Sequence, residues 1–176
     1  AVDGFVTATP YVLQGTDAPE TAPPPATPEE AARQLVQTDA DLIALSEATP
    51  AFMAIFDRVG GKVSHPHRVS DPTDTTDYAI AIASRLPLGP RSSVRLIGKL
   101  RLAVAEVEID GVMTTIEALN PRSTFDEAGQ ETWKQQIAEL TAHVPSVRGP
   151  LVVAGDLNST KFRPQFEELR RAGLED

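Results

Sequence analysis

The chain has 176 residues, a hydrophobic fraction of 41% and a formal net charge of −9, which suits one globular domain with a buried core. The negative charge argues against a protein that grips nucleic acid through a broad basic surface, because phosphate neutralisation supplies most non-specific affinity. The sequence has no cysteine, which excludes disulfides, thiolate nucleophiles and cysteine-ligated zinc. No apolar stretch approaches the ~20 residues that span a bilayer. The start without Met indicates a processed protein or a piece of a longer one.

The first part of the chain predicts one strand, one loop and one helix. Residues 5–13 are apolar and β-branched, interrupted by a single proline, and favour a strand. Residues 15–27 are rich in Pro, Ala and Thr, so we expect an exposed, mobile loop. A helix then begins at Thr27, whose hydroxyl suits a cap. Pro28 fits the first helical position, and Glu30 completes a capping box.

A buried strand and a second helix are expected next. Residues 42–45 form a continuous apolar run, typical of a strand covered on both faces. Thr49 and Pro50 open a helix that ends at the glycine pair 60–61. Its spacing predicts four buried side chains, those of Phe52, Ile55, Phe56 and Val59. Residues 62–77 are polar and contain prolines, which predicts a loop.

The rest of the chain alternates strands and helices. The pattern predicts a strand at 78–84, a hairpin at 100–119 turning at Asp110-Gly111, a helix around 130–144, a strand at 150–155 and a helix at 164–172. Hairpin strands mixed with helical crossovers indicate mixed sheets with helices outside, an α/β layered domain.

Polar side chains follow two of the predicted strands. Glu47 closes the first, and Asp156 closes the second with Asn158 just beyond. In α/β sheets, ligands bind outside the carboxyl ends of strands. A carboxylate there can hold Mg²⁺, a second can orient or deprotonate water, and an amide can donate to a phosphate oxygen. We expect Glu47, Asn120, Asp156 and Asn158 at one rim, with the strands ending at Glu47 and Asp156 nearly side by side.

Each of these residues also has an ordinary structural interpretation. Asp-x-Asn often bonds its own backbone in a turn, and Asn158, Ser159 or Thr160 could cap the last helix. Glu47 alone could be a solvated residue at a strand end.

The histidines and two arginines are weaker candidates. His65 and His67 are spaced to share a metal ion, but they lie in a proline-containing stretch without a third ligand, which favours a plain loop. His143 falls near a helix end, where it complements the helix dipole. Arg85 and Arg122 are either phosphate contacts or solvated surface charges.

Four segments, taken in order, carry a resemblance that covers most of residues 36–174. They are ADLIALSEATP (40–50), IASRLPLG (82–89), VMTTIEALNPRS (112–123) and GPLVVAGDLNST (149–160). Together they resemble the endonuclease/exonuclease/phosphatase superfamily, which includes deoxyribonuclease-like nucleases, abasic-site endonucleases, sphingomyelinases and inositol-phosphate phosphatases. The resemblance implies two packed mixed β-sheets flanked by helices, a four-layer sandwich classed as α/β, or as α+β by some schemes.

The resemblance also implies a hydrolase of phosphoester bonds that depends on Mg²⁺ or Mn²⁺. Glu47 would hold the metal ion, Asp156 would position or activate the attacking water, and Asn158 would contact the scissile phosphate. Asn120 stands where the family commonly has its central His. The acidic charge favours a small-molecule or lipid-borne phosphoester over long nucleic acid. Bacterial relatives with similar segments often follow membrane helices, which implies an extracytoplasmic domain of a membrane-anchored parent.

The chain departs from the family pattern at two further places. Thr9, Pro10 or Tyr11 stands where an Asn is expected, and the Asp-His pair expected near the C-terminus is missing from this sequence. We therefore expect a single domain over residues 1–176 that lacks the C-terminal part of the family fold, holds the metal weakly and turns over slowly. A longer chain with that pair is expected to be active. The alternative is a catalytically inactive member acting as a binding or structural module.

Overall fold

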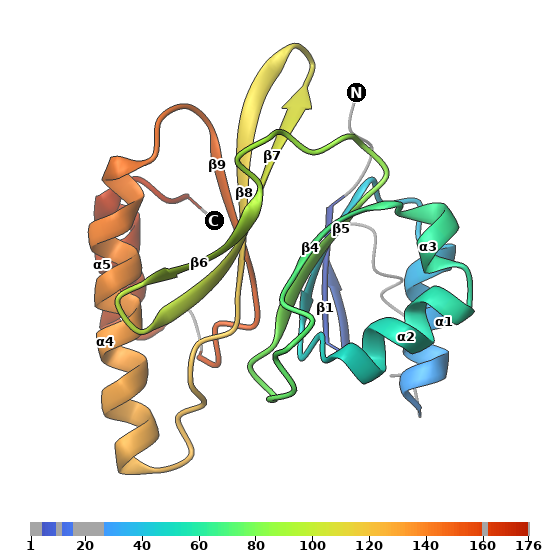
Figure 1. Cartoon of the computed structure of the whole chain (residues 1–176). Helices are drawn as coiled ribbons and strands as arrows, with labels where there is room; N and C mark the ends of the chain where they lie inside the picture. The colour runs from blue at the N-terminus through green and yellow to red at the C-terminus, as the bar shows by residue number, and fades with distance from the viewer. Residues whose placement is uncertain (1–4, 10–11, 16–26, 160–161, 176) are drawn as a thin grey trace.

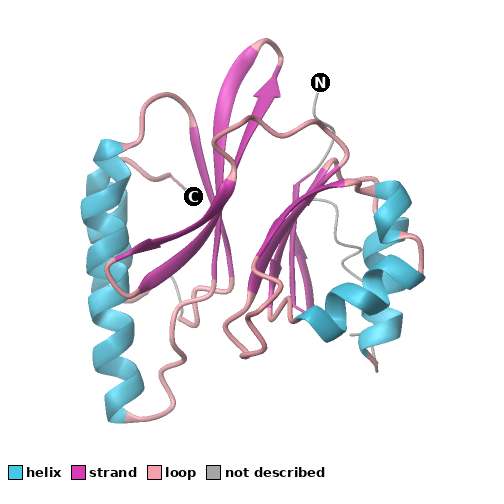
Figure 2. Cartoon of the chain, in the orientation of Figure 1, coloured by secondary structure: helices cyan, strands magenta, loops and turns pink. Residues whose placement is uncertain are grey.

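Two mixed β-sheets pack face to face, and helices cover the outer side of each (Figures 1 and 2). The computed structural model describes residues 5–9, 12–15, 27–159 and 162–175, with only the backbone for 5–9 and 12–15. The layers run helix, sheet, sheet, helix, so the predicted four-layer α/β sandwich is confirmed.

The first sheet has the strand order β2-β1-β3-β5-β4, and only β1 and β3 run parallel. Three helices lie on its outer face (Figure 1). The strands are β1 (Phe5–Thr9), β2 (Val12–Gly15), β3 (Leu42–Ser46), β4 (His67–Ser70) and β5 (Ile80–Ser84), and the helices are α1 (Pro28–Gln37), α2 (Pro50–Arg58) and α3 (Gly61–Ser64). The Thr27 and Thr49 hydroxyls accept hydrogen bonds from the Glu30 and Phe52 backbone N–H groups, so both predicted caps form.

The second sheet has the order β6-β7-β8-β9, with β8 and β9 parallel. Its outer face is covered by α4 and α5 (Figure 1). The elements are β6 (Ser93–Ile97), β7 (Leu100–Ile109), β8 (Val112–Leu119), α4 (Glu127–His143), the 3₁₀ turn Val144–Ser146, β9 (Leu151–Gly155) and α5 (Pro164–Ala172). Asp110 and Gly111 both have positive φ, as the predicted two-residue hairpin turn requires.

The core consists of three apolar layers. One lies between the sheets and includes Leu42, Ile82 and Ile116, and the other two lie under the helices of each sheet. All five residues of β3 are buried, as predicted for a strand covered on both faces. Because the two sheets share the central layer, the C-terminal ends of β3, β8 and β9 lie at one edge of the sandwich. We call this edge the rim.

Several expected elements differ in the structure. Instead of the one strand expected over residues 5–13, the structure has the antiparallel strands β1 and β2, with Thr9 paired to Val12. The predicted loop at 62–77 contains the end of α3 and strand β4, and β6 was not predicted. Both β4 and β6 are edge strands, which need no continuous apolar pattern.

Two smaller expectations also change. Ile55 on α2 and Val59, which directly follows this helix, are only half-buried, while Phe52 and Phe56 are buried as predicted. Of the predicted loop at 15–27, Gly15 ends β2 and Thr27 caps α1, and residues 16–26 lie outside the described part of the chain. No helix within the described residues is long and apolar enough to cross a membrane.

Candidate functional site

Three of the expected site residues each follow directly on a strand. Glu47 follows β3, Asn120 follows β8, and Asp156 follows β9. The parallel strands β8 and β9 end at the same edge of their sheet. The Asp156 backbone N–H donates to Ser46 Oγ at 3.0 Å, which joins the end of β9 to the end of β3 in the other sheet. The two strand ends that carry Glu47 and Asp156 are therefore joined across the sandwich, and their strands are neighbours between sheets rather than within one.

Gly155 makes this junction possible. Its φ of +131° lies in a region that side chains rarely adopt, and a Cβ there would lie 2.0 Å from the Leu119 carbonyl oxygen. Positive φ also occurs at Glu47 and Asn158, which are two of the three non-glycine cases among the described residues. Such backbone is uncommon outside glycine and gathers at functional sites. The ends of β3 and β9 thus carry the backbone signature of a site.

Asn158 is held by a network that decides which of its atoms faces a ligand. Its Nδ2 donates to Asn120 Oδ1 at 3.0 Å and to the Pro121 carbonyl at 2.9 Å. Since a carbonyl oxygen only accepts, the atom facing Pro121 must be the nitrogen. Both amide hydrogens are thereby used within the protein. The atom left for a ligand is Oδ1, an acceptor, whereas the sequence suggested an amide that donates to phosphate.

Asn120 links three loops around the site. It is almost fully buried, its Oδ1 accepts from Asn158, and its Nδ2 donates to the Asp77 carbonyl at 2.9 Å. Both ends of its amide therefore have partners within the protein. This geometry suits a residue that positions Asn158 and Asp77 rather than one that contacts the reacting atoms.

The surroundings of the Glu47 carboxylate oppose its negative charge. Burial raises its pKa above the ordinary value, and the negative charges of Asp77 and Asp156 raise it further. Asp77 was not predicted from the sequence, because it lies in the loop between β4 and β5 and closes no apolar run. Glu47 and Asp77 also line a small pocket of about 210 Å³ beside α2. Glu47 therefore lies within the electrostatic reach of two other acidic side chains at this rim.

Asp156 is exposed and held at two points. One is the bond from its backbone N–H to Ser46, and the other is the Asn158 backbone N–H, which donates to Asp156 Oδ1 at 2.8 Å. The expected Asx turn therefore forms, and it leaves the second carboxylate oxygen toward solvent. The intervening Leu157 carbonyl accepts from Trp133 Nε1 at 2.8 Å, so α4 also holds this segment.

The rim suits a hard cation only in part. Carboxylate and amide oxygens are the ligands that Mg²⁺ prefers, and this ion usually keeps several waters while bound by one or two carboxylates. A bound cation would offset the repulsion that the charges of Asp77 and Asp156 exert on Glu47. However, no three His, Cys, Asp or Glu side chains in the described part of the chain are arranged to hold a metal ion. The rim therefore offers oxygen ligands of the kind that Mg²⁺ takes, but the described residues do not form a complete set of protein ligands.

The other candidates lie elsewhere or are occupied. Arg85 pairs with Asp39 at 2.9 Å at the start of β3, the opposite end of the sheet from Glu47, so it is no phosphate contact here. His65 is buried between Ser64 Oγ and the Ala40 carbonyl and has no free nitrogen for a metal. His65 and Pro66 form the short connection between α3 and β4, as the loop interpretation expects, whereas His67 begins β4.

His143 and Arg122 have specific partners. His143, in the last turn of α4 as expected, bonds through Nε2 to the buried Glu117 carboxylate at 2.8 Å. The Arg122 guanidinium lies 5.1 Å from the ring centre of Tyr78, close to Asn120. Of the positions where the family has an Asn, Thr9 ends β1 without a described side chain, and Pro10 and Tyr11 lie outside the described residues.

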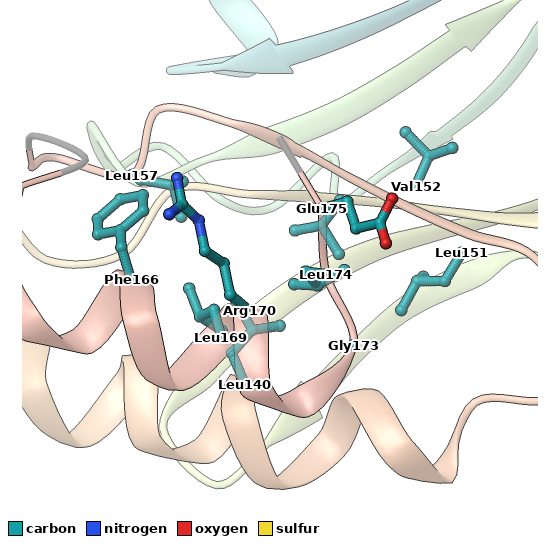
Figure 3. A pocket seen from close by; sticks show the side chains of 11 residues that line it. Leu140, Leu151, Val152, Leu157, Phe166, Leu169, Arg170, Gly173, Leu174 and Glu175 are labelled. Atoms are coloured by element: carbon teal, nitrogen blue, oxygen red, sulfur yellow. The ribbon is translucent and has the colours of Figure 1, made fainter.

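Another pocket lies away from this rim. It has a volume of about 400 Å³ and lies between β9, α4, α5 and the residues after α5 (Figure 3). Its lining is mostly aliphatic, and of the segment 156–158 it includes only Leu157. A smaller, polar pocket of about 250 Å³ borders the rim and includes Asn120 and Arg122.

The model of the Endonuclease/Exonuclease/phosphatase family matches residues 12–176. The chain belongs to this family. A comparison with curated proteins finds no match. Solved structures of similar fold include a β-hairpin deletion mutant of beta toxin from Staphylococcus aureus, with a TM-score of 0.67, 15% identity, and coverage of 96% of this chain and 71% of that one.

Two further structures show the same family fold. Sphingomyelinase C from Streptomyces griseocarneus has a TM-score of 0.66 and 14% identity, over 98% of this chain and 70% of that one. A beta toxin mutant from Staphylococcus aureus with bound magnesium ions has a TM-score of 0.58 and 16% identity, over 80% of this chain and 61% of that one. At these identities the likeness establishes the fold alone, and the chain spans about two thirds of each relative's length.

Proposed function

We propose that the chain is a metal-dependent hydrolase of phosphoester bonds, with its site where β3 and β9 end. The observation that carries this proposal is the convergence of Glu47, Asp156 and Asn158, held together by the Asp156–Ser46 hydrogen bond across the two sheets. Membership of the Endonuclease/Exonuclease/phosphatase family supports the reaction class.

Glu47 is the residue proposed to hold Mg²⁺ or Mn²⁺, with Asp77 and the Asn158 Oδ1 as oxygen neighbours. A bound divalent ion would neutralise the charge that develops on the phosphoryl oxygens. The magnesium ions bound in the beta toxin mutant support this choice of cofactor. Because the described residues offer no cluster of three ligands, we propose that the ion is held weakly.

Asp156 is proposed to act on the attacking water. Its Oδ1 is occupied by the Asn158 backbone N–H, so its other oxygen is the one that accepts the water's proton. The water oxygen forms the new bond to phosphorus, the ester P–O bond breaks, and the leaving oxygen takes a proton from solvent and departs as the alcohol. Asn120 and Ser46 act as positioning residues, because each bonds to one side of the β9 end.

The substrate is proposed to be a small-molecule or lipid-borne phosphoester. The chain's net charge of −9 disfavours long nucleic acid, and sphingomyelinase C among the structural neighbours is named for a lipid substrate. We also propose, from the sequence resemblance alone, an extracytoplasmic location in a membrane-anchored parent protein.

Turnover of bis-p-nitrophenyl phosphate tests the proposal. We expect slow hydrolysis by this chain that requires Mg²⁺ or Mn²⁺ and disappears with EDTA. The Asp156→Ala variant should lose about 10²- to 10⁴-fold in rate, the usual contribution of a positioned acid–base group. The matched control is Asp39→Ala, which removes an exposed carboxylate at the opposite end of the sheet and should retain the rate.

Two results would reject the proposed function. One is hydrolysis that survives EDTA or the loss of the Asp156 carboxylate. The other is complete inertness with either metal across lipid, nucleotide and inositol phosphoesters, which would favour the alternative of an inactive binding module.

A further inference from the structure

The polar pocket that borders the rim has an unusual charge for this protein. Its lining includes Lys99, Arg101 and Arg122 but only one carboxylate, Asp74, whereas the whole chain carries a net charge of −9. We call this pocket the basic groove and define it by those four residues together with Tyr78 and Asn120. Its volume of about 250 Å³ is below the ordinary range for a whole ligand, so it suits one group of a larger molecule.

Two of the three cations in the basic groove are available to a ligand. Arg101 is paired with the buried carboxylate of Asp74 and lies 3.8 Å from Asp71. Lys99 and Arg122 are both exposed, and neither forms an ion pair with any described residue. The positive charge that faces solvent therefore comes from Lys99 and Arg122.

The fold holds these two cations at the groove. The Gln136 side chain on α4 accepts from the Arg122 backbone N–H at 2.7 Å and donates to the Lys99 carbonyl at 3.1 Å. One side chain thus connects the segment after β8 to the turn before β7. The Arg122 guanidinium also lies over the Tyr78 ring, which limits its motion. The groove is positioned by specific contacts rather than by two unconstrained surface charges.

The basic groove and the acidic rim share their border. Asn120 lines the groove and accepts from Asn158 at the rim. Tyr78 lines the groove and directly follows Asp77, whose charge acts on Glu47. A phosphoester whose scissile phosphate lies at the rim would therefore present its next group to Lys99 and Arg122.

We propose that the basic groove is a subsite for a second anionic group of the substrate, a phosphate one unit away from the scissile phosphate. This inference rests on the proposed function and narrows its substrate class to compact phosphoesters with two phosphates. Arg122 supplies a planar fork of donors for phosphate oxygens, and Lys99 supplies a point charge.

The first test measures binding of inorganic phosphate in EDTA, which needs neither metal nor turnover. The double variant Lys99→Gln/Arg122→Gln should bind phosphate about ten- to a hundredfold more weakly than the wild type, as expected for lost charge-assisted hydrogen bonds. The matched control Lys62→Gln/Arg95→Gln removes the same charge from exposed positions outside the groove and should bind like the wild type. Equal binding by both double variants would overturn the proposal.

The second test compares kcat/KM for two substrates. One is thymidine 5′-(p-nitrophenyl phosphate), and the other is the same compound with an added 3′-phosphate. The wild type should prefer the phosphorylated form about tenfold or more, and the groove variant should lose that preference. A third possible result is that the protein binds oligothymidylate through Lys99 and Arg122 but does not bind free phosphate. That result would reject the proposed compact substrate with two phosphates and would indicate a nucleic-acid ligand instead. Phosphate binding without any turnover would leave the groove as an anion site and reject the proposed function instead.

Discussion

Residues at the end of β9 are constrained mainly through their backbones. Gly155 passes close to β8, the Asp156 N–H bonds to β3, and Asn158 adopts positive φ while its amide bridges to Pro121. These constraints place the Asp156 carboxylate and the Asn158 Oδ1 at the rim without either side chain being buried. At this scale, the site depends on a turn that only certain residues can form.

Replacement of Gly155 by alanine should be strongly destabilising. The new Cβ would lie 2.0 Å from the Leu119 carbonyl oxygen, so the parallel pair β8–β9 must separate, and the positive φ adds strain. We expect a loss of about 2–4 kcal/mol in the free energy of unfolding, measured by urea denaturation. Gly111→Ala is the control, since its φ is also positive but no atom lies within 4 Å, and it should cost only about 1 kcal/mol. Equal losses at both positions would show that the close approach is unimportant.

His65 should make the fold sensitive to mild acid. Burial lowers its pKa, and this outweighs the opposing effect of the hydrogen bond to the Ala40 carbonyl. A depressed folded-state pKa means that the neutral form favours the native state. The associated stability is present above the unfolded value of about 6.5 and is lost as pH falls through the folded pKa.

Urea midpoints measured between pH 7.5 and pH 5 test this effect. The wild type should lose stability over that interval, and His65→Gln, although less stable at neutral pH, should lose less of it on acidification. The prediction fails if the variant and the wild type show the same pH dependence.

Three strands and one helix position the side chains at the rim. The C-terminal ends of β3, β8 and β9 meet there, and α4 holds the segment after β9 through the Trp133–Leu157 hydrogen bond. Trp133 is fully buried, so its hydrogen bond ties the Leu157 backbone to a side chain that the core holds in place.

Trp133→Phe should uncouple α4 from the site segment. Phenylalanine keeps most of the apolar contact but leaves the Leu157 carbonyl without its donor, at a cost of about 1–3 kcal/mol in unfolding free energy. Turnover should fall as well, because Asp156 and Asn158 flank the released carbonyl. Denaturation followed by circular dichroism measures the first effect. Gln135→Ala on the exposed face of α4 is the control and should stay within about 0.5 kcal/mol. A fully stable, fully active Trp133→Phe protein would show that this bond does not position the segment.

Elements with strong local signals could be predicted from the sequence. The helix starts at Thr27 and Thr49 and the Asp110-Gly111 turn depend on neighbouring residues only. The edge strands β4 and β6 could not be predicted, because their pairing depends on partners distant in sequence and their outer sides face solvent. Asp77 and the Asn158–Pro121 bond were missed for the same reason, since tertiary contacts alone bring them to the rim.

At the scale of the whole molecule, charge is distributed unevenly. Glu47, Asp77 and Asp156 gather at the rim, while Lys99 and Arg122 occupy the adjoining groove. An acidic site suited to a cation therefore lies beside a basic site suited to an anion, which is the arrangement that a phosphoester with a second phosphate would require.

Glu47 is the residue proposed to hold the divalent ion used in phosphoester hydrolysis. The most direct test is the Mg²⁺ dependence of bis-p-nitrophenyl phosphate turnover in the wild type and in Glu47→Gln, which keeps the size of the side chain but removes its charge. We expect the wild type to show metal-dependent turnover that rises with Mg²⁺ over a weak-binding range, and Glu47→Gln to need about tenfold or more Mg²⁺ for the same rate. An unchanged Mg²⁺ dependence in Glu47→Gln would show that this carboxylate does not hold the ion.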